Sequence, residues 1–159
     1  MAVTLNHTGF IVNDLDKGIE FYRDALGLEL DRTADSSSPG LSSIVGYDNA
    51  HIRAAFLVGA DGHTLELIQY INPPGAARSS DELRERAIVG AAHLAFLVED
   101  VDAVYKRLLA AGGHELNPPV VPRPGVKVCY LQDPDGNWIE IMQHDVHNAS
   151  PFRIRQNTG

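Results

Sequence analysis

Two histidines and two glutamates have the residue types and the spacing to bind a divalent metal. His7 and Glu66 lie in the first half of the chain, and His93 and Glu140 lie in the second half. Two imidazoles and two carboxylates provide the nitrogen and oxygen ligands that suit Zn, Ni, Co, Mn or Fe(II). Two neighbouring buried carboxylates without a cation would repel each other, and one of them would become protonated. We therefore expect these four residues to bind one divalent metal ion.

The four residues occupy equivalent positions in an internal repeat. Residues 7–16 align with residues 93–102 at a shift of 86 positions, and residues 61–69 align with residues 135–143 at a shift of 74. Two matches in the same order indicate two copies of one structural unit. A single histidine on a strand is more often a core residue than a ligand. Four possible ligands at matched positions make a metal site the stronger interpretation.

Each copy has the pattern of one strand, one helix and three further strands. In the first copy, Asp14 is the predicted N-cap and Gly27 the predicted C-cap of a helix over residues 15–26. A second helix is predicted over residues 101–111. The strands are predicted over residues 5–12, 28–33, 52–58 and 64–71 in the first copy, and over residues 92–98, near 114, 127–132 and 138–143 in the second.

The segments between these elements are rich in residues that interrupt regular structure. Residues 34–43 are serine-rich and contain a Pro-Gly pair, so we expect a mobile loop there. Residues 133–137 have the sequence of a hairpin turn, in which a glycine adopts a positive φ and fixes the strand register. A short charged helix is expected over residues 79–86, with Ser80 as its N-cap.

Strand alternation places both glutamates on the face of the sheet opposite to the core. Aliphatic residues flank Glu66 and Glu140 on both sides, and neighbouring side chains on a strand point to opposite faces. If a pseudo-two-fold axis relates the two copies, the four ligands can converge inside a cup formed by a curved eight-stranded sheet. The same alternation predicts a partly apolar pocket for a small molecule, lined by Ile68, Tyr70, Ala95, Trp138 and Met142.

These elements predict an α+β fold in which two βαβββ modules form a single domain over residues 1–144. A structure-breaking Asn-Pro-Pro-Gly sequence begins the connection between the modules, and the polar C-terminal tail has no clear pattern. The expected divisions are residues 3–72 for the first module, 73–90 for the linker, 91–144 for the second module and 145–159 for the tail.

Composition and charge narrow the class of partner. Lys and Arg number 13 and Asp and Glu number 21, which gives a net charge of −8. Such a surface repels phosphate backbones and anionic lipids, so we expect neither nucleic acid nor membrane as a partner. The N-terminus lacks a signal-peptide pattern, no segment approaches the ~20 apolar residues of a membrane helix, and Cys129 is the single cysteine. These features favour a cytoplasmic protein.

Five segments together carry a resemblance to a known superfamily. They are residues 7–14 (HTGFIVND), 21–28 (FYRDALGL), 65–68 (LELI), 93–98 (HLAFLV) and 133–141 (DPDGNWIEI). With them the chain resembles the vicinal oxygen chelate superfamily, also called the glyoxalase/bleomycin resistance/dioxygenase superfamily. The resemblance implies paired βαβββ modules around a divalent metal, a small-molecule substrate and a homodimer. In some relatives the metal site is shared between subunits, and both arrangements stay open here.

The ligand set His, Glu, His, Glu resembles that of glyoxalase I. This resemblance implies a metal-dependent lyase or isomerase in which Glu140 is the base and Glu66 is the equivalent residue of the first copy. Bacterial glyoxalase I has an arginine for glutathione at the position of Ile11, and methylmalonyl-CoA epimerase typically has glutamine at the position of Glu66. The alternatives are an extradiol-type dioxygenase with Fe(II) and a binding or resistance protein without catalysis.

Overall fold

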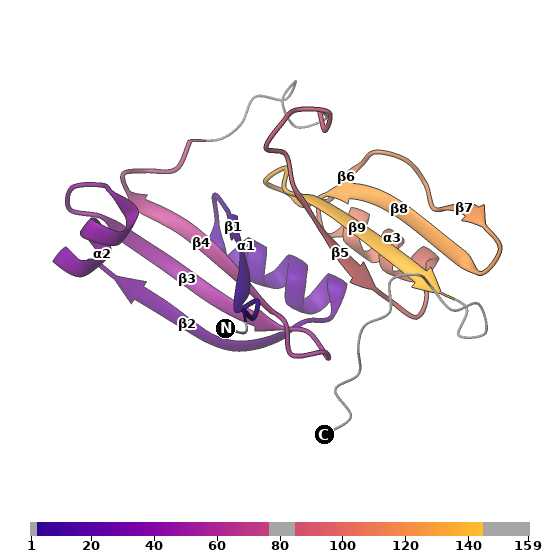
Figure 1. The fold of residues 1–159 in the computed structure, drawn as a ribbon, viewed down its shortest axis with the longest axis horizontal. Helices are drawn as coiled ribbons and strands as arrows, with labels where there is room; N and C mark the ends of the chain where they lie inside the picture. The colour runs from indigo at the N-terminus through magenta and orange to yellow at the C-terminus, as the bar shows by residue number, and fades with distance from the viewer. Residues whose placement is uncertain (1–2, 77–84, 145–159) are drawn as a thin grey trace.

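The two predicted modules each form a separate β-sheet covered by a helix (Figure 1). The structure is a computed structural model that describes residues 3–76 and 85–144. The first module contains β1 (His7–Ile11), α1 (Leu15–Ile19), η1 (Glu20–Leu26), β2 (Glu29–Ser36), α2 (Pro39–Val45), β3 (His51–Val58) and β4 (Thr64–Asn72). The second contains β5 (His93–Leu97), α3 (Val101–Ala110), β6 (His114–Glu115), β7 (Val120–Arg123), β8 (Val126–Gln132) and β9 (Trp138–His144).

The strand order is the same in both sheets. It is β1-β4-β3-β2 in the first module and β5-β9-β8-β6 in the second, where β7 also pairs with β8. The first strand of each module runs parallel to the last, and the other pairs are antiparallel. This topology confirms the α+β fold and the two βαβββ modules. The predicted eight strands divide between two sheets, and β7 is an additional strand.

The first helix begins and ends where the sequence predicts. The Asp14 carboxylate accepts hydrogen bonds from the backbone N–H groups of Asp16 and Lys17, and Gly27 ends the helix with a φ of 104°. From Glu20 onward the helix changes to π geometry. Within this wider turn, the neighbouring Phe21 and Tyr22 are both buried.

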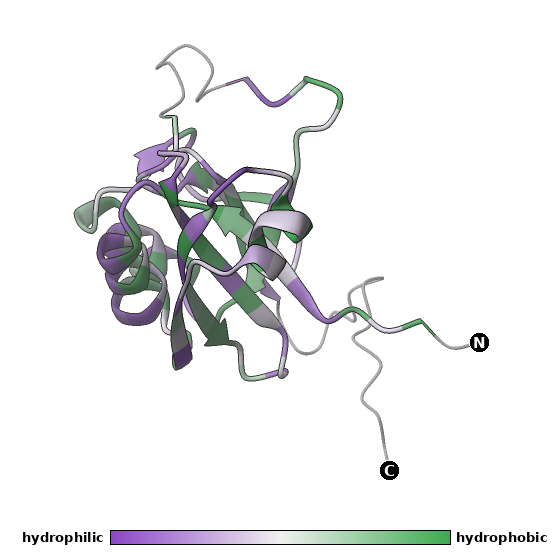
Figure 2. Ribbon diagram, turned by 90° about the vertical axis from the view of Figure 1, so that its left-hand side faces the viewer, coloured by the Kyte–Doolittle hydropathy of each residue, from purple (hydrophilic) through white to green (hydrophobic). Residues whose placement is uncertain are grey.

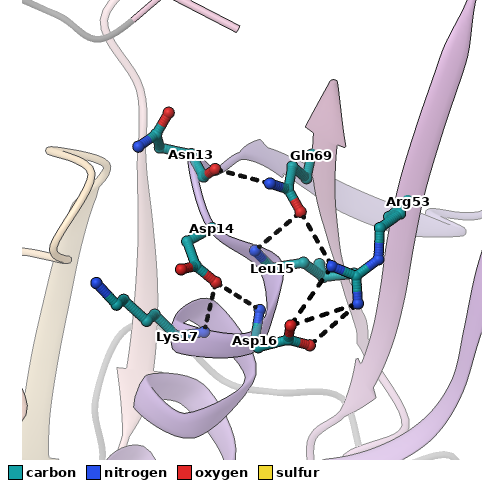
Figure 3. Close-up of polar contacts among 7 residues, drawn as sticks. All are labelled: Asn13, Asp14, Leu15, Asp16, Lys17, Arg53 and Gln69. Carbon is teal, nitrogen blue, oxygen red and sulfur yellow. Dashed lines mark hydrogen bonds and ion pairs between the residues drawn. The ribbon is translucent and has the colours of Figure 1, made fainter. Parts of the chain in front are cut away.

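A glutamine within the first module's last strand fixes the start of its helix (Figure 3). The Gln69 side chain accepts from the N–H of Leu15 at 3.3 Å and donates to the carbonyl of Asn13 at 2.9 Å. Beside it, the Arg53 guanidinium pairs with the Asp16 carboxylate at 3.1 Å. These contacts attach β3 and β4 to the first turn of α1.

The second module repeats two of these contacts at the equivalent positions of the repeat. Gln143 accepts from the N–H of Val101 at 3.1 Å, and Lys127 forms an ion pair with Asp102. Helix position relative to the sheet is therefore set in the same way in both modules.

The prediction of a mobile loop over residues 34–43 is wrong. β2 continues to Ser36, and α2 follows it. The Ser38 hydroxyl accepts from the N–H of Leu41, and Pro39 occupies the first turn of the helix. A Ser-Pro sequence that resembles a chain breaker is thus a helix start. Beyond α2, the Tyr47 ring packs edge-on against Tyr70, with 5.9 Å between the ring centres.

One hydrophobic core joins the modules. It contains the helix-facing residues of both sheets, and these hydrophobic positions recur along the strands and helices in Figure 2. Tyr22 lies at the junction, where its hydroxyl donates to the Asp133 carboxylate at 2.9 Å and its ring lies near that of Phe96. Asn137 also donates from its side chain to the carbonyl of Ile11 at 3.1 Å. The predicted turn over residues 133–137 therefore also connects the two modules.

Two predictions fall partly or wholly outside the described residues. Of the helix predicted over residues 79–86, the structure describes only Glu85 and Arg86, which are not helical. The C-terminal tail over residues 145–159 lies outside the described part. Among the described helices, none is long and apolar enough to cross a membrane.

Candidate metal centre

The first His–Glu pair lies on β1 and β4. Glu66 is opposite Gly9 in the parallel register, and His7 lies two residues earlier on β1, on the same face. The Nε2 atom of His7 is 3.1 Å from Oε2 of Glu66. The side-chain oxygen of Asn6 lies 2.7 Å from Nδ1 of His7. If Nδ1–H donates to this oxygen, the Nε2 lone pair is available for a metal.

The second His–Glu pair repeats this geometry on β5 and β9. Glu140 is opposite Ala95, and the Nε2 atom of His93 is 3.3 Å from Oε2 of Glu140. Tyr130 on β8 is directly opposite Glu140 in the register, and its ring lies edge-on to the His93 ring with 5.2 Å between centres. Burial raises the pKa of the Tyr130 hydroxyl, and the adjacent Glu140 carboxylate raises it further.

The two pairs are similarly exposed to solvent. The side chains of Glu66 and Glu140 are 17% and 12% exposed, whereas those of His7 and His93 are 43% and 46% exposed. Each carboxylate is thus set into the sheet, and each imidazole lies at its open side. This is a nitrogen and oxygen donor pair with room for further ligands, which fits a divalent metal.

The two pairs do not converge within one chain. Among residues 3–76 and 85–144, no group of three His, Cys, Asp or Glu side chains is close enough to hold a metal ion. The hydrogen bond from Asn137 to Ile11 places the start of β9 at the end of β1. His7 lies at the other end of β1, four residues away, which corresponds to about 13 Å along a strand. One chain therefore holds two separate His–Glu pairs, each a candidate half-site for a metal.

An arginine lies over an aromatic ring beside each glutamate. In the first module, the Arg32 guanidinium is 3.9 Å from the ring centre of Phe56, which is opposite Glu66 in the register. In the second, the Arg86 guanidinium is 4.2 Å from the ring centre of Tyr130 and 5.2 Å from that of Trp138.

Sequence reasoning did not identify these two arginines. Phe56 and Tyr130 are related by the repeat shift of 74, which could have indicated the aromatic positions. The arginines themselves have no such relationship, because Arg32 lies on β2 and Arg86 lies in the linker.

A cavity of about 650 Å³ lies between the first strand and the linker. It is lined by Gly9, Phe10, Ile11, Val12, Asn13, Gly75, Ala76, Glu85, Ile88, Val89, Gly90, Ala91, Ala92, Asp135, Asn137 and Trp138.

The five predicted pocket residues differ in their relation to this cavity. Trp138 lines it, and the other four do not. Ile68 and Tyr70 follow Glu66 on the same face of β4. Ala95 is opposite Glu140, and Met142 follows Glu140 on β9.

The single cysteine is unsuited to act as a nucleophile. Cys129 is 1% exposed, and its burial raises the pKa of its thiol to about 12. The thiolate is the reactive form of cysteine, and it is scarce at neutral pH when the pKa is this high. The candidate centre therefore consists of imidazole and carboxylate groups.

The comparisons with known proteins agree on one family. The model of the Glyoxalase/Bleomycin resistance protein/Dioxygenase superfamily matches residues 4–141. A probable lactoylglutathione lyase of Synechocystis is 30% identical over 145 residues, covering 87% of this chain and 94% of that protein. A 2-epi-5-epi-valiolone epimerase of Actinomyces is 30% identical over 159 residues, covering 95% and 84%. The crystal structure of a glyoxalase family protein from Bacillus cereus has a TM-score of 0.81 at 22% identity, covering 91% of this chain and 95% of that one.

Proposed function

Because this chain belongs to the glyoxalase/bleomycin resistance protein/dioxygenase superfamily, we propose that it is a divalent-metal-dependent lyase or isomerase. Its reaction would move a proton on a small substrate that contains a carbonyl group. The observation that carries the proposal is the pair of His–Glu contacts at 3.1 Å and 3.3 Å in matching registers of the two modules. The relatives named as a lyase and as an epimerase support this class of reaction.

The complete metal site in this proposal belongs to a homodimer. His7 and Glu66 of one copy and His93 and Glu140 of a second copy would be the ligands, because one chain keeps the two pairs apart. Ile11 and Leu97 support an interface here, since they occupy equivalent repeat positions on β1 and β5 and are 48% and 59% exposed. Apolar side chains exposed on the strand faces that carry both half-sites favour cover by another chain.

The chain's own residues define the proton transfer. When bound, a divalent metal supplies polarisation of the substrate carbonyl, which makes the adjacent C–H bond more acidic. The Glu140 carboxylate would accept this proton, and Tyr130 opposite it would hold the carboxylate in position. Glu66 occupies the equivalent position in the other half-site and could return a proton to the product.

Metal content is the direct test of the site. We expect the purified parent protein to bind one divalent metal per site, and the His7→Ala and His93→Ala variants to lose it. His51→Ala is the matched control, because His51 pairs with Asp35 at 2.7 Å, away from both glutamates. Equal metal content in the parent and in both ligand variants would contradict the proposed ligands.

Solvent deuterium exchange tests the reaction class. We expect the metal-loaded parent to incorporate deuterium into a 2-oxo, 2-hydroxy or acyl thioester compound, observed by NMR, and to stop doing so after chelation. Oxygen consumption with a catechol and Fe(II) would instead favour the dioxygenase alternative. A metal-free protein that binds small molecules without turnover would favour the binding-protein alternative.

A further inference from the structure

We propose that Arg86 binds an anionic oxygen group of the substrate, either a carboxylate or a phosphate. The inference rests on the proposed function for the location of the reacting carbon, and it adds the substrate class. Arg86 lies in the linker shortly before β5, and its guanidinium is 4.2 Å from the ring centre of Tyr130.

The position of Arg86 follows from the strand register. Tyr130 is opposite Glu140, and Trp138 lies two residues before Glu140 on β9, so all three side chains share one face of the sheet. The Arg86 guanidinium lies over the rings of both aromatic residues. It therefore lies on the sheet face that presents the second His–Glu pair.

Stacking leaves the hydrogen-bonding edge of a guanidinium available. The cation contacts the aromatic ring through its flat face, whereas its N–H donors lie in its plane. The aromatic rings also remove water from one side of Arg86, and this strengthens a charge-assisted hydrogen bond to a carboxylate or phosphate. In a chain with a net charge of −8, this is a local positive group beside the proposed reaction centre.

The first module offers an informative comparison. Arg32 lies over Phe56, and Phe56 is opposite Glu66 just as Tyr130 is opposite Glu140. Arg32 forms an ion pair with Asp31 at 2.7 Å, which neutralises much of its charge. Arg86, over two aromatic rings, is the better candidate for binding an anion. A substrate of this site would thus combine a carbonyl group with an acidic group.

Trp138 provides a direct spectroscopic test because it is the only tryptophan of the chain and lies 5.2 Å from the Arg86 guanidinium. Succinate and inorganic phosphate would be titrated into chelator-treated protein while tryptophan fluorescence is recorded. We expect at least one of the two anions to change the fluorescence of the parent with saturation, and the Arg86→Gln variant to lose this response. The more effective anion identifies the recognised group.

Arg23→Gln is the matched control. It removes the same charge from η1, on the helix side of the sheet, where Arg23 pairs with its neighbour Asp24. We expect this variant to respond as the parent does. A parent that responds to neither anion would overturn the proposal, and so would an unchanged response in Arg86→Gln.

Two hydroxamates separate this inference from the proposed function. Butyrohydroxamate is a neutral metal chelator, and the monohydroxamate of succinic acid adds a carboxylate to a similar skeleton. In metal-loaded parent we expect the acidic compound to bind roughly 10–100-fold more tightly, as one charge-assisted contact predicts. Arg86→Gln should lose this preference while it binds the neutral compound as the parent does, which also shows that the variant is folded. If neither hydroxamate binds while the anion response persists, the metal site fails and the Arg86 site stands.

Discussion

At the scale of single residues, the two half-sites differ in what holds the imidazole. The His7 ring has the Asn6 side-chain oxygen at Nδ1, whereas the His93 ring lies edge-on to Tyr130. In both halves Nε2 faces a glutamate oxygen at hydrogen-bond distance. The orientation of each Nε2 toward a carboxylate is therefore shared, and the partner that supports it is not.

Replacing the proposed base should separate proton transfer from metal binding. Glu140→Gln keeps the shape of the side chain and an oxygen ligand but removes the basic carboxylate. We expect deuterium exchange to slow by roughly 10²–10⁴-fold while the variant still contains metal. The measurement is exchange by NMR together with elemental analysis. If Glu140→Gln exchanges as fast as the parent, the base lies elsewhere, and Glu66→Gln is the next variant to measure.

Asn6 should strengthen metal binding although it is not a ligand. Asn6→Ala removes the hydrogen-bond partner of Nδ1 of His7, so the ring loses its fixed orientation. Partners of this kind typically change metal affinity by roughly 10–100-fold. Competition with a chromophoric chelator would measure the loss of metal affinity. Asn117→Ala is the control, because Asn117 lies in the loop between β6 and β7. Unchanged affinity would show that the Asn6 contact does not support binding.

The four candidate ligands could be found from sequence because duplication marks equivalent positions. His7 and His93 are equivalent through one shift, and Glu66 and Glu140 through the other. Arg86 could not be found this way, since its place over Tyr130 depends on the path of the linker in three dimensions. Repeat analysis detects what both copies share, and it does not detect what one copy acquires separately.

At the scale of elements, a glutamine and an ion pair place each helix on its sheet. Gln69 and Gln143 accept from helix N-terminal N–H groups, and Arg53 and Lys127 pair with acidic residues in the same turns. Because the same contacts occur in both copies, we expect helix docking to depend on them.

Removing either glutamine side chain should destabilise the fold by a similar amount. Gln69→Ala and Gln143→Ala each leave a helix N–H without its acceptor, so we expect a loss of roughly 1 kcal/mol in the free energy of unfolding. Urea denaturation would measure both. A loss in one variant and none in the other would show that the repeated geometry does not mean an equal contribution.

The helices and strands with hydrophobic periodicity were predicted well, and the irregular elements were not. Capping by Asp14 and termination by Gly27 follow directly from residue type. The π geometry after Glu20 depends on how Phe21 and Tyr22 pack against the rest of the molecule, which sequence periodicity does not contain. α2 was missed because its serines and Pro39 also suit a loop.

At the scale of the whole molecule, a buried polar contact joins the modules. Asp133 is 1% exposed, and it accepts from the Tyr22 hydroxyl, from Asn137 and from the N–H of Asp135. Burial raises the pKa of the Asp133 carboxyl, and the nearby Asp135 raises it further, although the hydrogen bonds from Asn137 and Tyr22 oppose this.

This carboxyl should make the effect of Asp133→Asn depend on pH. A pKa that is higher in the folded state means that Asp133 stabilises the fold most when protonated, and that this contribution is lost as pH rises through the folded pKa. The variant loses hydrogen bonds, which costs about 1–3 kcal/mol, but it also lacks the buried charge. Its deficit against the parent in urea denaturation should therefore be larger near pH 4.5 than near pH 7.5. An equal deficit at both pH values would contradict the raised pKa.

A site shared between two copies should allow inactive variants to rescue each other. In a mixed dimer of His7→Ala and His93→Ala chains, one site contains both substitutions and the other contains neither. Random mixing should restore about a quarter of parental activity, since half of the dimers are mixed and each has one intact site. The measurement is deuterium exchange after refolding the two variants together. No recovery, from variants that refold together into dimers, would contradict a site shared between two copies.

The unequal lengths of the two modules have a consequence for the orientation of a bound substrate. The first module contains α2, followed by Tyr47 packed against Tyr70, whereas the second module has the short strand β7 beside β8 (Figure 1). Two identical halves would accept a substrate in either of two orientations with equal free energy. Halves that differ in this way give the two orientations different free energies, so a substrate of the proposed site should bind in one of them, with its reacting carbon toward the same glutamate in every turnover.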